Sequence, residues 1–193
     1  MIWLYVPSAA EAQRAVVVQH SRELTIALHL RPFAGIAFLW FMGVIRDRLG
    51  NLEDRFFATI FLGSGLLYVA MMFLSGALAH AVLTLLAAGP RTPMTSSSYD
   101  LARQEVFGIT AVYATRMAGV FMMSTSTILM RTRIAPRWIA ILGYLLALVL
   151  LLSASTRTWL ALAFPLWVML VSLWMLHIRG QKLGTDAATA GRS

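Results

Sequence analysis

The sequence predicts an all-α integral membrane protein, a bundle of about five transmembrane helices. Of its 193 residues, 59% are hydrophobic and only 12% are charged, whereas soluble domains are about half apolar and about a quarter charged. Intrinsic disorder and a coiled coil both require far more charge than this. The chain contains no cysteine, which excludes disulfides, thiol nucleophiles and cysteine-ligated metal centres.

Five segments are apolar and long enough to cross a hydrocarbon core about 30 Å thick, which takes about 20 residues of helix. They are residues 24–45, 56–86, 105–130, 138–154 and 159–178. The second is about 46 Å long as a straight helix, so we expect it to tilt, to kink near residues 63–65, or to protrude from the bilayer. The last two are separated at residues 153–158, where an arginine and four hydroxyl side chains favour a turn.

The chain divides into three parts on this basis. Residues 1–23 are expected to form an interfacial or extended leading segment, because their apolar start is too short for a signal peptide. Residues 24–179 form the transmembrane helical domain. Residues 180–193 are small and polar, which predicts a disordered cytoplasmic tail.

The basic residues predict the orientation of the bundle. With five spans, nine of the 16 basic residues fall on one side: Arg46, Arg48, Arg55, Arg131, Arg133, Arg137, Arg179, Lys182 and Arg192. Six fall on the other: Arg14, Arg22, Arg31, Arg91, Arg103 and Arg157. Because cytoplasmic loops carry the excess of positive charge, the N-terminus is expected outside and the C-terminus in the cytoplasm. This scattered charge also argues against a nucleic-acid partner, which needs basic residues gathered on one soluble face.

Several stretches of the sequence carry a resemblance to a known group of proteins. They are residues 33–50, 53–59, 116–127 and 131–138. Together they resemble a multi-span membrane protein family of unknown function that is common in actinobacteria, over roughly residues 32–179. The resemblance implies a multi-pass protein of a bacterial plasma membrane, and it implies no catalytic activity.

Two arginines lie where a bilayer resists charge. Arg31 and Arg116 each precede an arginine of the cytoplasmic side, Arg46 and Arg131, by 15 residues. Both are therefore expected about 22 Å above the inner boundary, in the outer third of the core. A charge at that depth costs a few kcal/mol unless it snorkels, pairs or faces water.

Two interpretations of these arginines remain open. In the first, Arg31 and Arg116 converge on an anion at the outer leaflet, a lipid phosphate or a carboxylate, with His29, Tyr113 and Thr115 close enough to contribute. In the second, each arginine snorkels independently to the headgroups and covers apolar surface with its aliphatic stem.

The four histidines invite a haem or metal interpretation, which requires two rings at one depth. Counted from Arg46 and Arg55, His29 lies about 26 Å and His80 about 38 Å along their helices, so we do not expect the two rings to meet. No metal-ligand spacing of histidine and glutamate occurs in the sequence. The histidines are therefore predicted to be interfacial, with no cofactor and no metal.

The third segment combines small residues with hydroxyl groups. Ala111, Thr115 and Gly119 recur at intervals of four, which lets another helix approach closely. The hydroxyls of residues 124–127 are expected to bond back to carbonyls one turn earlier or across to a neighbouring helix. Both features favour helix packing over a polar transport path.

Two classes of function follow from this composition. The first is a non-enzymatic membrane protein that binds a lipid or small anion, or serves as an accessory subunit, with membrane lipids, other membrane subunits or a second copy as partners. The second is a transporter or enzyme acting on a lipid-like substrate. The spans contain no central carboxylate, and the chain lacks a nucleophile–base pairing and internal repeats, all of which favour the first class.

Overall fold

The computed structural model describes residues 21–49, 55–87, 96–152 and 162–177, and these are helical throughout except for a turn at residues 133–136. The helices are α2 (Ser21–Leu49), α3 (Arg55–Ala87), α4 (Ser96–Phe107), the π-helix η4 (Gly108–Ala114), α5 (Thr115–Thr132), α6 (Arg137–Leu152) and the helix Leu162–His177. The predicted all-helical fold is confirmed for the described residues. The parts of the predicted leading segment and tail at residues 1–20 and 180–193, and the predicted turn at 153–158, lie outside them.

Three of the helices are long and apolar enough to cross a membrane. They are Thr25–Asp47, Phe56–Leu85 and Leu101–Thr132, with 23, 30 and 32 residues. The apolar helices Arg137–Leu152 and Leu162–His177 are shorter. The third long helix runs continuously through α4, η4 and α5. It begins at Ser96, nine residues before the predicted apolar segment, because hydropathy identifies only the apolar part of a helix.

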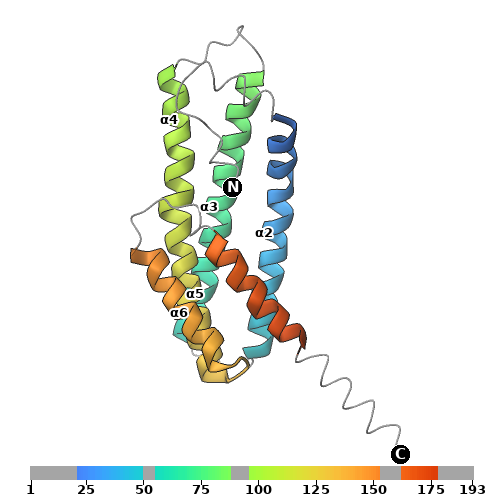
Figure 1. Ribbon diagram of the computed structural model, residues 1–193, viewed down its shortest axis with the longest axis vertical. Helices are drawn as coiled ribbons and strands as arrows, with labels where there is room; N and C mark the ends of the chain where they lie inside the picture. The colour runs from blue at the N-terminus through green and yellow to red at the C-terminus, as the bar shows by residue number, and fades with distance from the viewer. Residues whose placement is uncertain (1–20, 50–54, 88–95, 153–161, 178–193) are drawn as a thin grey trace, which may run out of the picture.

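In Figure 1, α3 stands between α2 on one side and the continuous α4–η4–α5 helix on the other, and both neighbours run antiparallel to it. Three pairs of neighbours align α2 with α3: Arg31 with Gly76, Gly35 with Phe73 and Met42 with Gly65. Two pairs align α3 with the third helix: Ser75 with Thr110 and Gly65 with Phe121. We call the end of the bundle where α2 begins and α3 ends the upper end, as it is drawn in Figure 1.

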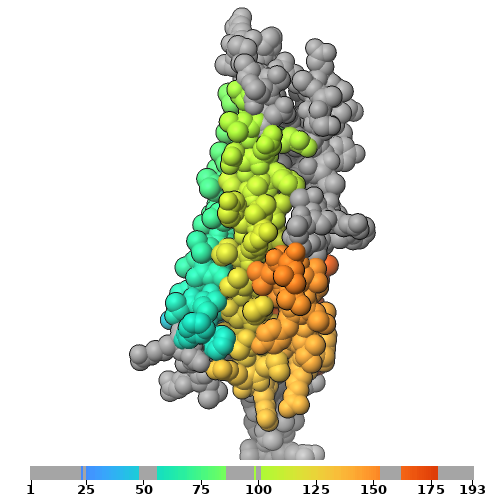
Figure 2. Space-filling view, turned by 90° about the vertical axis from the view of Figure 1, so that its left-hand side faces the viewer, coloured from blue at the N-terminus to red at the C-terminus, as the bar shows by residue number. Residues whose placement is uncertain are grey.

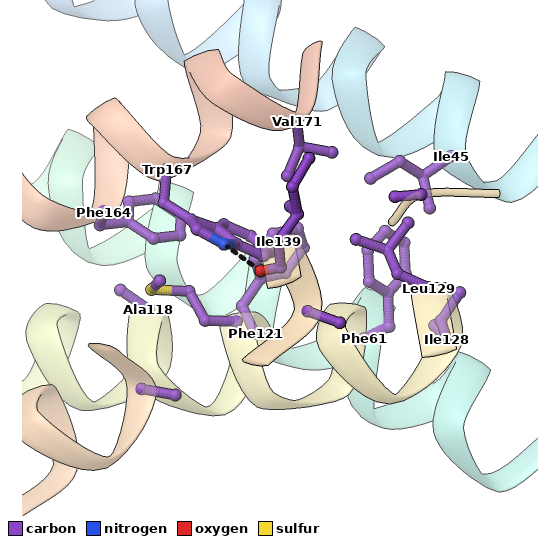
Figure 3. Close-up of a cluster of buried hydrophobic side chains, with 14 of the residues drawn as sticks. Ile45, Phe61, Ala118, Phe121, Ile128, Leu129, Ile139, Phe164, Trp167 and Val171 are labelled. Carbon is purple, nitrogen blue, oxygen red and sulfur yellow. Dashed lines mark hydrogen bonds between the residues drawn. The ribbon is translucent and has the colours of Figure 1, made fainter. Parts of the chain in front are cut away.

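The buried core lies in the lower half of the bundle, where α6 and the helix Leu162–His177 join the three long helices (Figure 1). Figure 2 shows α6 packed beside the lower part of α5. Rings from four helices meet in this core: Phe61 stacks on Phe121 at 4.8 Å between centroids, and Phe38 lies 5.0 Å from Phe121 and 5.6 Å from Phe164. In Figure 3, the indole N–H of Trp167 donates to the carbonyl of Ile139, at 3.3 Å.

The close approach predicted for the third segment is present at Gly119. A Cβ atom added there would lie 3.2 Å from the carbonyl oxygen of Ala147 in α6. The hydroxyl prediction is confirmed for three of the four residues 124–127, whereas the hydroxyl of Ser126 has no hydrogen-bond partner among the described residues. Ser124 and Thr125 donate to carbonyls four residues earlier at 2.8 Å. Thr127 bonds back to Met123 and across to the hydroxyl of Tyr144, at 2.9 and 2.7 Å.

α3 is a single helix of 33 residues that is not interrupted at residues 63–65. The hydroxyl of Ser64 donates to the carbonyl of Ile60 at 2.6 Å. Gly65 lies against both Met42 and Phe121. The glycine therefore serves the packing of α2 and α5 against α3, since a side chain there would press on Met42, 2.6 Å from the Cβ position.

Candidate functional site

Arg31 turns toward α3 near the upper end of the bundle. Its Cδ and Nη1 atoms lie 3.4 and 3.5 Å from the place that a Cβ atom of Gly76 would occupy. The side chain is half-buried. The guanidinium group thus packs against α3 at Gly76, at van der Waals distance from the position of a Cβ atom.

The rings of His29 and His80 lie next to one another across the same pair of helices. Their centroids are 5.7 Å apart and the ring planes are nearly perpendicular, at 88°. His29 Nδ1 donates to the carbonyl oxygen of Thr25, 2.8 Å away. Both histidines are exposed, and His80 is one helical turn beyond Gly76. The expectation that these two rings do not meet is wrong.

The rings meet because Arg46 and Arg55, from which their depths are counted, do not lie at one level. The alignment of α2 with α3 places Arg46 opposite residue 62. Arg55 therefore lies about seven residues, or about 10 Å, below Arg46. This offset nearly cancels the difference of about 12 Å in the expected depths of His80 and His29, so the two rings lie at a similar level.

The same offset separates the two arginines that were expected at one depth. The pairs that align α3 with its neighbours place Arg31 opposite Gly76 and Arg116 opposite residues 69–70. The backbone of Arg116 therefore lies about 9–10 Å lower than that of Arg31. The two side chains also have different neighbours, since Arg116 Nη1 donates at 3.0 Å to the carbonyl of Val112 on its own helix.

Arg116 follows directly on the π-helix η4, and the polar side chains around it form a second group. Thr115 donates both its backbone N–H and its hydroxyl to the carbonyl of Thr110, the hydroxyl at 3.0 Å. The hydroxyl of Thr110 donates to the carbonyl of Val106 and bonds to the hydroxyl of Ser75 at 2.7 Å. π-helical turns are rare and often occur at functional sites.

Four of the five predicted binding residues, His29, Arg31, Thr115 and Arg116, lie in two groups, together with three residues that were not predicted. The first, which we call the α2–α3 basic cluster, consists of His29, Arg31 and His80. The second, the π-helix cluster, consists of Ser75, Thr110, Thr115 and Arg116. The groups adjoin at Ser75 and Gly76, which are neighbours in α3. The remaining predicted residue, Tyr113, is exposed in η4 at 59%.

Sequence reasoning missed three members of these groups: His80, Ser75 and Thr110. The sequence indicates no contact between His80 and His29, because the depths counted from Arg55 and Arg46 differ by about 12 Å. The close packing of glycine against large residues indicates the correct alignment, since Gly35 of α2 faces α3, and Gly65 and Gly76 of α3 face α2. No sequence signal indicated the π-helix.

Among the described residues, no group of three or more histidine, cysteine, aspartate or glutamate side chains is placed to hold a metal ion. No family model, no curated protein and no solved structure matches this chain.

Proposed function

We propose that the chain is a non-enzymatic membrane protein that binds a phosphate-type anion at the upper end of the bundle, with Arg31 as the principal contact. The anion is the headgroup phosphate of a membrane lipid or a small free anion of the same chemistry. In this proposal five helices cross a bacterial plasma membrane, and the upper end faces outward.

The packing of Arg31 beside Gly76 is the observation that carries the proposal, with His29 two residues and His80 one turn closer to the upper end. A guanidinium group stays charged in a protein and binds phosphate oxygens in a fixed, two-pronged geometry. Holding that charge half-buried between two apolar helices costs free energy, and an anion at the same level offsets this cost.

Arg116 has a supporting role in this proposal. Its guanidinium reaches back along its helix to Val112, toward the upper end, which is the direction in which an arginine snorkels to the headgroups. Thr115 and Tyr113 lie on the same helix. These residues would complete the rim of the site on the side of η4.

Lipid retention by the purified protein tests the proposal. Native mass spectrometry of the detergent-solubilised chain compares bound phosphatidylglycerol with bound phosphatidylcholine for wild type, Arg31→Gln and Arg116→Gln. Arg137→Gln is the matched control, because Arg137 is exposed at the opposite end of the bundle. We expect Arg31→Gln to reduce retention at least tenfold, Arg116→Gln to reduce it less, and the control to match wild type.

Two further measurements complete the test. The first is competition between inorganic phosphate and the bound lipid. Phosphate at about millimolar concentration displaces the lipid if the ligand is a small free anion, and it leaves the lipid bound if the ligand is a lipid headgroup. If Arg31→Gln retains phosphatidylglycerol as wild type does and its affinity for inorganic phosphate is unchanged, the proposal is wrong.

A further inference from the structure

The geometry of the two imidazole rings carries an inference that does not depend on anion binding by Arg31. We infer that His29 and His80 form a binding site for a late first-row transition metal ion, Zn²⁺ or Cu²⁺, at the upper end of α2 and α3. The distance between the rings, the hydrogen bond of His29 and the exposure of both side chains support it.

The separation of the rings suits a shared metal ion. Two imidazoles on one zinc ion, each with its nitrogen about 2.0–2.1 Å away, have centroids about 5.2 Å apart at the tetrahedral angle and about 6.4 Å apart in a straight line. The observed separation of 5.7 Å lies between these limits. The ring centroids are therefore at a separation that a shared metal ion allows without displacement of α2 from α3.

The hydrogen bond to Thr25 prepares His29 for this role. A carbonyl oxygen only accepts, so Nδ1 of His29 carries the proton of that bond and Nε2 of the neutral ring keeps its lone pair. A metal-bound histidine typically donates its other ring nitrogen to a carbonyl or carboxylate in this way, which fixes the ring and raises its basicity.

The ligand set decides which metal ions the site takes. Imidazole nitrogen suits Zn²⁺, Cu²⁺ and Ni²⁺, whereas Mg²⁺ and Ca²⁺ prefer oxygen ligands. Two histidines leave coordination positions for water or an anion. The guanidinium of Arg31 lies beside Gly76, about one helical turn from His80, so its charge opposes a bare dication and favours an anion as a further ligand.

Copper binding followed by electron paramagnetic resonance tests the inference directly. The protein carries an affinity tag without histidine, and Cu²⁺ is added to the detergent-solubilised chain. We expect one Cu²⁺ per chain with hyperfine splitting from two imidazole nitrogens, and a Zn²⁺ titration that displaces it. His29→Ala and His80→Ala should each lower the copper affinity at least tenfold, whereas His177→Ala, at the far end of the last helix, should leave it unchanged.

The remaining variants separate this inference from the proposed anion site. Arg31→Gln should strengthen Cu²⁺ binding several-fold because it removes a nearby positive charge, while it weakens phosphate binding. Helix content and monodispersity of each variant show that the chain is folded. The inference is wrong if folded wild type binds no Cu²⁺ in a two-nitrogen site, or if the affinity survives unchanged in either folded histidine variant, whatever the result for lipid retention.

Discussion

Gly143 lies where α6 packs against both α5 and the helix Leu162–His177. A Cβ atom added at this position would meet the hydroxyl oxygen of Ser126 and would lie 2.8 and 2.9 Å from two carbon atoms of the Trp167 indole. Both neighbours are buried. Since heavy atoms do not pack this closely, Gly143→Ala forces the indole or the helix to move.

The magnitude follows from two opposed effects. Replacing glycine by alanine inside a helix gains about 1 kcal/mol, whereas overpacking a well-packed core costs about 1–3 kcal/mol. The rigid indole and the facing helix leave little freedom to relax, so we expect Gly143→Ala to lower the free energy of unfolding by about 1–2 kcal/mol.

The hydroxyl of Ser126 gives this prediction a matched partner. It is buried and has no hydrogen-bond partner among the described residues, so Ser126→Ala should be neutral or stabilising by about 1 kcal/mol. The same change removes the closest obstacle to a side chain at Gly143. The double variant should therefore be less destabilised than the two single changes predict, with a coupling of about 0.5–1 kcal/mol.

Equilibrium unfolding of the four proteins in mixed micelles, with increasing sodium dodecyl sulfate, measures this cycle. If Gly143→Ala is as stable as wild type, or if the two changes are additive, the close packing of α6 described above is incorrect.

Three other substitutions test separate parts of the structure. Gly119→Val should lower stability by about 1–3 kcal/mol in the same assay, because it pushes α6 away from α5; an unchanged midpoint would contradict the close approach. Trp167→Phe should cost about 2 kcal/mol, because it removes the indole donor to the carbonyl of Ile139 and creates a cavity; a loss below about 0.5 kcal/mol would show that this bond contributes little. Gly76→Leu should displace the Arg31 guanidinium and reduce phosphatidylglycerol retention in native mass spectrometry as Arg31→Gln does. Full retention would show that lipid binding does not depend on the position of the guanidinium beside Gly76.

Composition and apolar run length were enough to predict the helices. Each of the five predicted segments overlaps a described helix, because about 20 apolar residues without a break leave few alternatives to a helix. The bonding of Ser124, Thr125 and Thr127 also followed from local spacing, since a hydroxyl one turn after a carbonyl reaches it within the same helix.

What sequence reasoning misjudged was the alignment of one helix with the next. Arg46 and Arg55 do not lie level, because α2 packs along α3 with small residues against large ones, as at Gly65 with Met42. An error of seven residues in that alignment was enough to separate His29 from His80. The π-helix at Gly108–Ala114 likewise has no local sequence signature.

The alignment of α2 with α3 is therefore the central claim, and the absence of cysteine in the chain makes it directly testable. Two double variants are compared in native membranes with a short thiol-reactive crosslinker: His29→Cys with His80→Cys, and His29→Cys with Met72→Cys. Residue 72 is the position that lies opposite His29 if Arg46 and Arg55 are level. We predict efficient crosslinking of the first pair and little of the second. Crosslinking of the second pair in place of the first would overturn the alignment, and with it the α2–α3 basic cluster and the metal site.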